Sequence, residues 1–290
     1  MDLGKQNILF FTRTMMLGGT ENVVLQLCEV FKPKVNKIVV CSCGGVNVEK
    51  LTEMGIRHYQ IPDISSKKDI FKICRTVKQI VEKEQITVIH SHHRMAAFYT
   101  EILFGSSIIK IANAHNTFFD KKLLTKFVYK HTKVIAVGEM VKKNLVDYFK
   151  IPEKQVSVIH NAVKPFDGNY LEDKYIRKLH DDGNFVVGNI GRLSEQKGME
   201  YFIESIPKIL KKYPRTRFVI AGNGEDEQKL FNLVKKLGIE ECIKFLGYRK
   251  DVQNLMSQLD LIVLSSLWEG LPLTPVSYTH LRAHETTLHL

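Results

Sequence analysis

Two cations flanked by glycines stand where the sequence changes from a β-branched run to a helical one. In GNIGRLSEQKG, Arg192 and Lys197 follow the run FVVGNI and precede an amphipathic stretch. Gly191 and Gly198 allow backbone N–H groups to come close to a ligand. Fixed cations at a strand end could neutralise a diphosphate leaving group. The segment therefore predicts an anion site, and two solvated surface cations are the alternative if the pair is taken alone.

Two more glycine turns follow strand-like runs. Gly18 and Gly19 in TMMLGGTEN open the first helical stretch, so their amides can approach an anion at a positive helix end. This turn lacks the GxGxxG spacing of dinucleotide sites, and a simple tight turn explains it equally well. Gly224 in AGNGEDEQ has the same kind of position in the second half. In FLGYRKD, Tyr248 and Arg249 could border a nucleobase, and surface positions are equally compatible with the sequence.

The last strand-like run, LIVLSS, leads into a loop that combines a carboxylate with closely spaced backbone amides. In SSLWEGLPLTP, Glu269 is followed by Gly270 and Leu271. A carboxylate accepts hydrogen bonds from sugar hydroxyls, and free amides donate to phosphate. We expect this loop to face a sugar or a phosphate.

The elements that must position these loops alternate along the chain. Short β-branched runs are separated by amphipathic helical segments, which is typical of an α/β protein with parallel, doubly wound sheets. The alternation lapses over residues 161–184, where Pro, Gly, Asn and Asp accumulate. We therefore predict two Rossmann-like domains, residues 1–160 and 185–275, joined by a linker at 161–184. Their strand ends are expected to face each other across a cleft.

Composition limits the class of protein. The chain has 290 residues, of which 44% are hydrophobic and 25% charged, as in ordinary soluble globular proteins. No apolar run approaches the ~20 residues of a membrane span, and no signal-type region follows Met1, so a cytoplasmic protein is expected. Five cysteines without a CxxC pair argue against a disulfide framework or a zinc knuckle.

Positive charge concentrates in the first half of the chain. Residues 1–160 hold 24 Lys and Arg against 14 Asp and Glu, whereas residues 161–290 hold 18 against 17. The first half thus carries +10 of the net charge of +11. Such a surface suits nucleic acid, an anionic membrane or a phosphorylated acceptor. Charge that serves solubility alone is an equally good explanation.

Five motifs together resemble one enzyme family. GG-x-E at residues 18–21, GRLSEQKG, AGNGE, FLG and EGLPLTPV occur in the order found in family-4 retaining glycosyltransferases, which have the GT-B fold of two Rossmann-like domains. The resemblance runs from residue 7 to residue 276. It implies transfer of a hexose or N-acetylhexosamine from a nucleotide sugar, UDP by family habit, to a glycan or lipid-linked acceptor. Cell-surface polysaccharide synthesis is the implied setting.

The resemblance also implies roles for the loops. Arg192 and Lys197 would hold the donor pyrophosphate, while Glu269 would contact the donor sugar as the first glutamate of the family's Glu-x7-Glu pair. Gly18 and Gly19 would let donor or acceptor approach from the first domain.

Histidines end two strand-like runs of the first domain. His115 in NAHNTF matches the family histidine expected beside the transferred sugar, although a buried or capping histidine is the alternative. In HSHHR, His90 and His92 share a strand face, which is possible metal geometry. No third ligand and no Asp-x-Asp accompany them, so we predict no metal and no other cofactor. We interpret His92 and His93 as residues that line the acceptor side of the cleft.

These charges suggest a mechanism. Arg192, Lys197 and helix N-termini would stabilise the departing diphosphate as the glycosidic bond breaks with oxocarbenium character. His115 and Glu269 are the predicted catalytic residues. No carboxylate pair for double displacement stands out, so we expect a front-face attack in which the leaving phosphate helps to take the acceptor proton.

A basic amphipathic segment lies in the first domain. FFDKKLLTKFVYKHTK places Lys122, Lys126 and Lys130 on one helical row and apolar residues, including Phe127, on another. One hypothesis is docking to an anionic membrane, which would place the protein at the inner face of the plasma membrane. The other is that the apolar row packs against the domain's own sheet, as every helix of a doubly wound fold does.

The closing stretch departs from the family pattern. The second glutamate of the Glu-x7-Glu pair should fall at residue 277, which is Ser277. The run VSYTHLRAHET resembles the translation of a sequencing adapter, so we expect residues 276–290 to be a non-native tail. The second domain would then be partial, and the chain as written is expected to be inactive.

Two other functions stay open at this stage. A UDP-sugar 2-epimerase would share the fold and cleave the same kind of bond, but its additional acid and base carboxylates are not evident. A basic Rossmann pair that binds nucleic acid would explain the charge but not Glu269 or the pair Arg192 and Lys197. We therefore expect a nucleotide sugar and no nucleic acid as partner.

Overall fold

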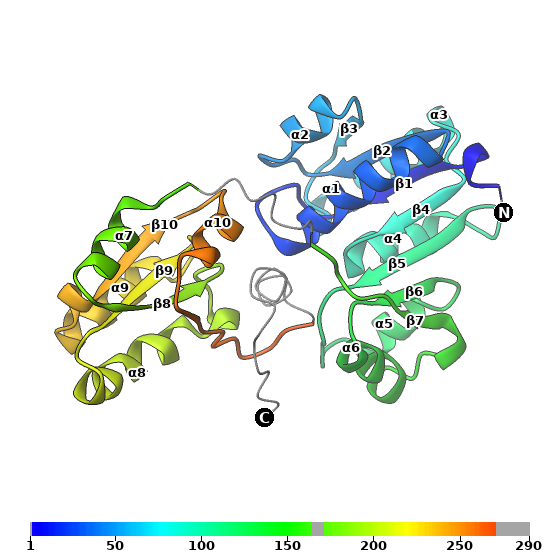
Figure 1. Ribbon diagram of the computed structural model, residues 1–290. Coiled ribbons are helices and arrows are strands. Elements are labelled where there is room, and N and C mark those ends of the chain that lie inside the picture. The colour runs from blue at the N-terminus through cyan, green and yellow to red at the C-terminus, as the bar shows by residue number, and fades with distance from the viewer. Residues whose placement is uncertain (1, 164–170, 271–290) are drawn as a thin grey trace. The chain divides into compact units, whose positions relative to one another are not determined.

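The computed structural model describes residues 2–163 and 171–270, and the chain divides into two compact units, Met1–Asn161 and Ala162–Leu290. The first unit contains seven strands: β1 (Asn7–Phe11), β2 (Lys37–Ser42), β3 (Arg57–Gln60), β4 (Val88–Ser91), β5 (Ile109–Ala114), β6 (Lys133–Ala136) and β7 (Val156–Val158). They form one parallel sheet in the order β3-β2-β1-β4-β5-β6-β7 (Figure 1).

Helices cover both faces of this sheet. They are α1 (Gly19–Phe31), α2 (Val48–Glu53), α3 (Ile70–Lys83), α4 (Arg94–Leu103), α5 (Lys122–Val128) and α6 (Glu139–Lys143), the last followed by a π-helical turn at Asn144–Tyr148. Alternate residues of β1 point to opposite faces. Ile8 and Phe10 pack with α1 and α2, whereas Leu9 and Phe11 pack with α3 and α4. Both faces are apolar because both are covered.

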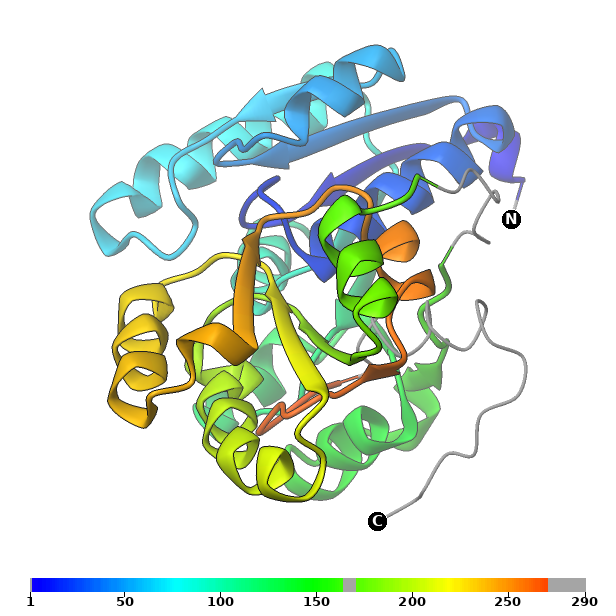
Figure 2. The same cartoon turned by 60° about the vertical axis from the view of Figure 1, so that its left-hand side comes forward.

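The second unit repeats this architecture with fewer strands. Its strands are β8 (Phe185–Ile190), β9 (Thr216–Ala221), β10 (Ile243–Gly247) and β11 (Leu261–Ile262), and its helices are α7 (Lys174–Asp181), α8 (Met199–Lys212), α9 (Glu227–Leu237) and α10 (Val252–Ser257). The parallel sheet has the order β10-β9-β8-β11. Helices α8 and α9 pack on one face and α7 and α10 on the other. Figure 2 shows α7 and α10 next to each other.

Three elements differ from the sequence-based expectations. Helix α7 lies inside the range 161–184 that was predicted as a linker, and its Ile176 and Leu179 are buried in the core of the second unit. Strand β3 was missed because its four residues, RHYQ, are polar and only partly buried. The run LIVLSS contributes only Leu261–Ile262 as a strand, and the rest forms a loop. The prediction of parallel, doubly wound sheets is confirmed in both units.

Each sheet contains one point at which the strand order reverses. After β3 the chain returns to the other side of β1 and adds β4, and after β10 it returns to the other side of β8 and adds β11. In open α/β sheets, ligands bind beyond the carboxyl ends of the strands at such a point. Ligands are therefore expected at the loops after β1, β4, β8 and β11. None of the helices in residues 2–163 and 171–270 is long and apolar enough to cross a bilayer.

Candidate functional site

The loop after β8 carries the two predicted cations of the second unit. Lys197 Nζ lies 2.5 Å from Glu269 Oε1, and both side chains are about one-fifth exposed, at 20% and 21%. Arg192 instead pairs with Glu225, 3.1 Å away, at an exposed position. The fold thus brings Lys197 and Glu269 together, although they are 72 positions apart in the chain. A cation next to a carboxylate at a strand end can bind two parts of a sugar nucleotide. The cation binds phosphate, and the carboxylate accepts hydrogen bonds from sugar hydroxyls.

Glycines let the backbones of these loops come into direct contact. Gly222 has φ +145°, and a Cβ built there would lie 1.8 Å from the carbonyl oxygen of Gly191. Gly224 approaches the next part of the same loop, since its Cβ would lie 2.2 Å from the carbonyl oxygen of Leu193. The amide of Leu193 donates in turn to Asn223 O at 2.9 Å. The glycines of AGNGE therefore allow the loop that carries Arg192 and Lys197, here called the cation loop, to pack against the end of β9.

The loop after β11 is fastened to the cation loop by polar groups. Ser265 Oγ donates to Lys197 O at 3.0 Å and accepts from Asn189 Nδ2 at 3.0 Å. Gln196 Nε2 donates to Trp268 O at 3.0 Å. These contacts place Glu269 beside Lys197. Sequence reasoning missed Ser265 and Asn189, because neither residue type marks a ligand site unless its contacts are known.

The loop after β10 contains both residues that the sequence offered as neighbours of a nucleobase, Tyr248 and Arg249. Tyr248 is 42% exposed and available to a ligand. Its neighbour Arg249 donates to Asp251 at 2.7 and 2.8 Å and to Asp173 at 2.6 Å. These carboxylates raise the pKa of Arg249, and the guanidinium lowers the pKa of Asp251. Arg249 thus connects the N-cap of α7 to the start of α10. This structural role differs from the expectation that Arg249 borders a nucleobase.

Gly270 and Leu271, the remaining predicted donor-binding residues, lie at the boundary of the described part of the chain. Gly270 is the last residue that the structure describes. Leu271 and Ser277 lie outside the described residues, as does the predicted tail at 276–290.

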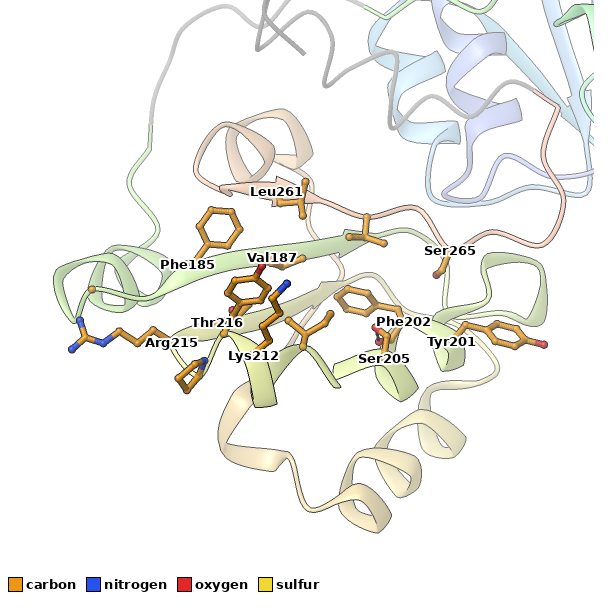
Figure 3. A pocket seen from close by; sticks show the side chains of 15 residues that line it. Phe185, Val187, Tyr201, Phe202, Ser205, Lys212, Arg215, Thr216, Leu261 and Ser265 are labelled. Atoms are coloured by element: carbon orange, nitrogen blue, oxygen red, sulfur yellow. Dashed lines mark hydrogen bonds between the residues drawn. The ribbon is translucent and has the colours of Figure 1, made fainter. Parts of the chain in front are cut away.

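The second unit also contains an apolar cavity of about 920 Å³. Phe185, Val187 and Leu261 line it from the strands, and Tyr201 and Phe202 line it from α8 (Figure 3). Its walls do not include Arg192, Lys197 or Glu269. Lys212 and Arg215 also line it, but they lie at the end of α8 and just before β9, at the amino ends of the strands. Ligands of open α/β sheets bind at the carboxyl ends, where Arg192 and Lys197 follow β8, so the glycine loops are the better candidate for an anion site.

Three imidazole rings gather at the carboxyl ends of β4 and β5 in the first unit. His92 Nδ1 lies 3.2 Å from His115 Nε2, and their rings stack with centroids 5.4 Å apart. The ring of His90 lies 4.4 Å from that of His92 and hydrogen-bonds through Nε2 to Asn113 Oδ1 at 2.8 Å. Phe10 packs against His90 and His92. The predicted residues His92 and His115 are therefore in contact.

Burial keeps these rings neutral. Desolvation lowers the pKa of His90 to about 4, against the favourable hydrogen bond to Asn113. Desolvation, with the neighbouring imidazoles, also lowers the pKa of His115 to about 4 and that of His92 well below its ordinary value. A neutral imidazole has one donor and one acceptor nitrogen. The cluster offers hydrogen bonds without charge.

His93 and the first glycine turn take local roles. His93 is the N-cap of α4, and its Nδ1 accepts from Met95 N at 3.1 Å. Gly18 is the N-cap of α1. The side chain of Glu21 folds back toward it, so that a Cβ at Gly18 would lie 2.4 Å from Glu21 Oε2. Glu21 Oε1 also accepts from Thr14 Oγ1 at 2.5 Å. A carboxylate already stands at the start of α1, beside the exposed Gly19.

The described residues contain no group of three or more His, Cys, Asp or Glu side chains placed to hold a metal ion. His90, which the sequence offered together with His92 as possible ligands, hydrogen-bonds to Asn113 instead.

Comparison with known families assigns both units. The model of Glycosyltransferase Family 4 matches residues 17–165, and that of Glycosyl transferases group 1 matches residues 172–281. The chain belongs to glycosyltransferase family 4. The resemblance inferred from the five motifs is thereby confirmed.

Relatives and solved structures agree with this assignment. A human phosphatidylinositol N-acetylglucosaminyltransferase protein is 27% identical over 275 residues, covering 88% of this chain and 55% of the relative. The Escherichia coli UDP-Gal:alpha-D-GlcNAc-diphosphoundecaprenol alpha-1,3-galactosyltransferase is 27% identical, covering 89% of this chain and 73% of the relative. The crystal structure of Anabaena HepE with UDP matches with a TM-score of 0.76 at 19% identity, covering 95% of this chain and 79% of that one. The last comparison shows the GT-B fold class.

The chain is shorter than the curated relatives that it matches. The chain spans 39% to 55% of the lengths of three curated relatives that it matches, about half.

Proposed function

We propose that this family 4 chain carries the donor and acceptor elements of a retaining glycosyltransferase that uses a UDP-sugar. The observation that carries the proposal is the contact of Lys197 with Glu269 at the carboxyl ends of β8 and β11. Lys197 and Arg192 bind the diphosphate, and Glu269 binds hydroxyls of a hexose or N-acetylhexosamine. Anabaena HepE, of the same fold class, was crystallised with UDP and with UDP-glucose, which supports the choice of donor.

The rest of the donor site follows from the loops. Gly224 permits close approach of the backbone, and Tyr248 borders the base. Gly270 and Leu271 offer amides to the phosphate or sugar. In the first unit, Gly18 and Gly19 shape the loop after β1, from which donor or acceptor approaches.

The chemistry depends on positive charge that the protein itself supplies. As the sugar–phosphate bond breaks, Arg192, Lys197 and the start of α8 stabilise the developing diphosphate charge. His115 contacts the transferred sugar, and the leaving phosphate accepts the proton of the attacking hydroxyl on the same face. Transfer is expected to be retained in excess EDTA, and trapping of a covalent glycosyl-enzyme would contradict the front-face route.

A lipid-linked acceptor fits the relatives. The Escherichia coli relative is named for a diphosphoundecaprenol acceptor and the human one for phosphatidylinositol, both of which are lipids. We therefore propose a lipid-linked glycan of cell-surface polysaccharide synthesis as the acceptor, with His93 on the acceptor side and the buried His92 in contact with His115. The corresponding location is the cytoplasm, next to the inner face of the plasma membrane.

The surface around α5 supports membrane contact. Leu123 is 84% exposed, and Phe119, just before the helix, is 72% exposed. Phe127 is partly exposed, at 46%, so the apolar row is only partly used for packing. Lys122, Lys126 and Lys130 lie on the same segment, and all three are exposed. Exposed apolar side chains among lysines are the composition of a helix that lies on an anionic bilayer.

Liposome co-sedimentation tests this surface. Binding to vesicles with anionic lipid should exceed binding to neutral vesicles, and Lys122→Glu should weaken it. Lys208→Glu, at a lysine of α8 in the other unit, is the matched control with the same change in charge. Sedimentation that does not depend on anionic lipid or on Lys122 would remove membrane docking from the proposal.

A transfer assay tests the enzymatic function itself. The chain and a chimera, in which residues 276–290 are replaced by the corresponding C-terminal part of the Escherichia coli relative, are incubated with radiolabelled UDP-glucose, UDP-galactose or UDP-N-acetylglucosamine and a polyprenyl diphosphate-linked sugar. Because the predicted tail lacks the second family glutamate, we expect little transfer by the chain and at least about tenfold more by the chimera, with retained configuration. Absence of transfer by both, or an inverted product, would contradict the proposal.

A further inference from the structure

The ring of His92 has one nitrogen without a partner. The residue is 2% exposed, and Nε2 is the one buried side-chain polar atom without a hydrogen bond in the described part of the chain. The other nitrogen, Nδ1, lies 3.2 Å from His115 Nε2. A side chain so deeply buried does not itself line the acceptor side, as the sequence had suggested, so its role must be exerted through its neighbours.

The contact with His115 admits two proton arrangements. Both rings are neutral near pH 7, since burial and the adjacent imidazoles disfavour their charged forms and lower the pKa of each. Each ring then has a single N–H, and the hydrogen bond needs one donor and one acceptor. Either His115 Nε2–H donates to His92, or His92 Nδ1–H donates to His115.

The orphaned nitrogen distinguishes the two. If His115 donated, His92 would carry its proton on Nε2 and bury an N–H without an acceptor. If His92 donates, its Nε2 carries only a lone pair. Folded proteins leave a buried N–H unpaired more rarely than a buried acceptor. The second arrangement is therefore favoured.

The adjacent side chains provide no acceptor for a proton on His92 Nε2. His90 Nε2 faces Asn113 Oδ1 at 2.8 Å, so its N–H is used there. The Phe10 ring, which also packs against His92, provides no conventional acceptor. His92 Nε2 keeps its lone pair, and His92 Nδ1 keeps the proton.

We propose that His92 is a positioning residue that fixes His115 as the tautomer with its proton on Nδ1. The ring of His115 is half-buried, and its Nδ1 is not among the buried, partnerless atoms. His115 then presents a neutral N–H donor to a hydroxyl or phosphate oxygen. It cannot serve as the base that takes the acceptor proton, because its remaining lone pair already accepts from His92. The biological meaning of this tautomer rests on the proposed sugar transfer, whereas its existence does not.

Nitrogen NMR of the full chain labelled with 15N-histidine tests the proposal without any activity. Long-range proton–nitrogen spectra at pH 7.5, assigned with His115→Gln, should show a protonated Nδ1 and a bare Nε2 for His115. His92→Asn, whose amide NH₂ can replace the Nδ1 donor, should preserve this pattern. His92→Leu should shift part of the His115 population to the Nε2-protonated form.

The possible results test the tautomer of His115 independently of the proposed enzymatic activity. A proton on His115 Nε2 in the unmodified chain overturns the proposal. So does an unchanged His115 spectrum in a folded His92→Leu. Should His92→Leu fail to fold, the spectra of the unmodified chain and of His92→Asn decide. A chain that shows the Nδ1–H tautomer but never transfers sugar would refute the proposed function and leave the role of His92 intact.

Discussion

The switch points of the two sheets present opposite chemistry. In the first unit, the ends of β4 and β5 carry buried neutral imidazoles, and the glycine turn after β1 already holds the carboxylate of Glu21 near Gly18. In the second unit, the ends of β8 and β11 carry Lys197 and Glu269 in contact, on backbones interlocked by glycines. Both sheets use the same topological position.

This difference indicates a division of labour within one architecture. A glycine turn that faces its own carboxylate is poorly suited to a phosphate, whereas a turn that carries cations is well suited to it. Neutral imidazoles, in contrast, can select hydroxyls without attracting the diphosphate. The fold sets where ligands bind, and the residues after each strand set which part of a ligand binds there.

The largest effect is expected from filling the backbone contact of the second unit. Gly222→Ala places a methyl group 1.8 Å from Gly191 O at φ +145°, so we expect a loss of about 3 kcal/mol or more in the free energy of unfolding. Urea unfolding followed by the fluorescence of Trp268, the single tryptophan, measures it.

Gly238→Ala is the matched control. Gly238 also has a positive φ, +63°, but nothing lies within 4 Å of its Cβ position. Only the backbone strain of about 1–2 kcal/mol is expected. Equal losses in the two variants would show that the interlocked loops do not depend on the glycine contact.

The next effect is pH-dependent and belongs to the first unit. The pKa of His90 is about 4 in the folded chain, below the ordinary value of 6.5, so the unfolded chain binds more protons between these values. The contribution of neutral His90 to the free energy of unfolding is therefore fully present above about pH 6.5, and it is lost as the pH drops toward 4. At pH 5 the loss from His90 alone should be about 2 kcal/mol. Hydrogen exchange of β4 and β5 peptides at pH 7.5 and 5 measures it.

His90→Gln sharpens this test. Its amide can replace the Nε2–H donor to Asn113 but does not titrate, so the variant should lose less stability on acidification than the unmodified chain. His160→Gln, at an exposed position, should leave the profile unchanged. A pH profile identical in all three proteins would contradict the assignment of a buried neutral His90.

The smallest effects should separate a structural arginine from a ligand-binding one. Arg249→Ala removes the bonds to Asp173 and Asp251 and should cost about 1–2 kcal/mol of stability, with little change in UDP affinity. Arg192→Ala breaks only an exposed pair and should cost less than about 1 kcal/mol, but it should weaken UDP binding about three- to tenfold. Thermal unfolding and calorimetric titration with UDP measure both; the reverse pattern would exchange their roles.

Much of this comparison could be predicted from the sequence. Alternating β-branched and helical runs revealed both sheets, since buried parallel strands are apolar along their length. Strand β3 escaped because Arg57, His58 and Gln60 at the sheet edge are polar. Helix α7 escaped because the Pro- and Gly-rich residues before it resemble a linker, while only Ile176 and Leu179 mark its buried side.

The site was predictable only in part. Arg192, Lys197 and Glu269 stood out because charge beside glycine at a strand end has few structural uses. The contact of Lys197 with Glu269 was not predictable, because a contact between residues 72 positions apart depends on the order of the strands. The link between His92 and His115 likewise required the register of β4 on β5.

Equilibrium binding of UDP to the full chain and to Lys197→Met is the most direct test of the central claim that the second unit holds a diphosphate. Lys236→Met, at a lysine in the last turn of α9, is the control with the same change in charge. UDP should bind the unmodified chain and the control equally, and Lys197→Met should raise the Kd about 10- to 100-fold. Absence of UDP binding to the unmodified chain, or the same Kd in all three proteins, would contradict this account.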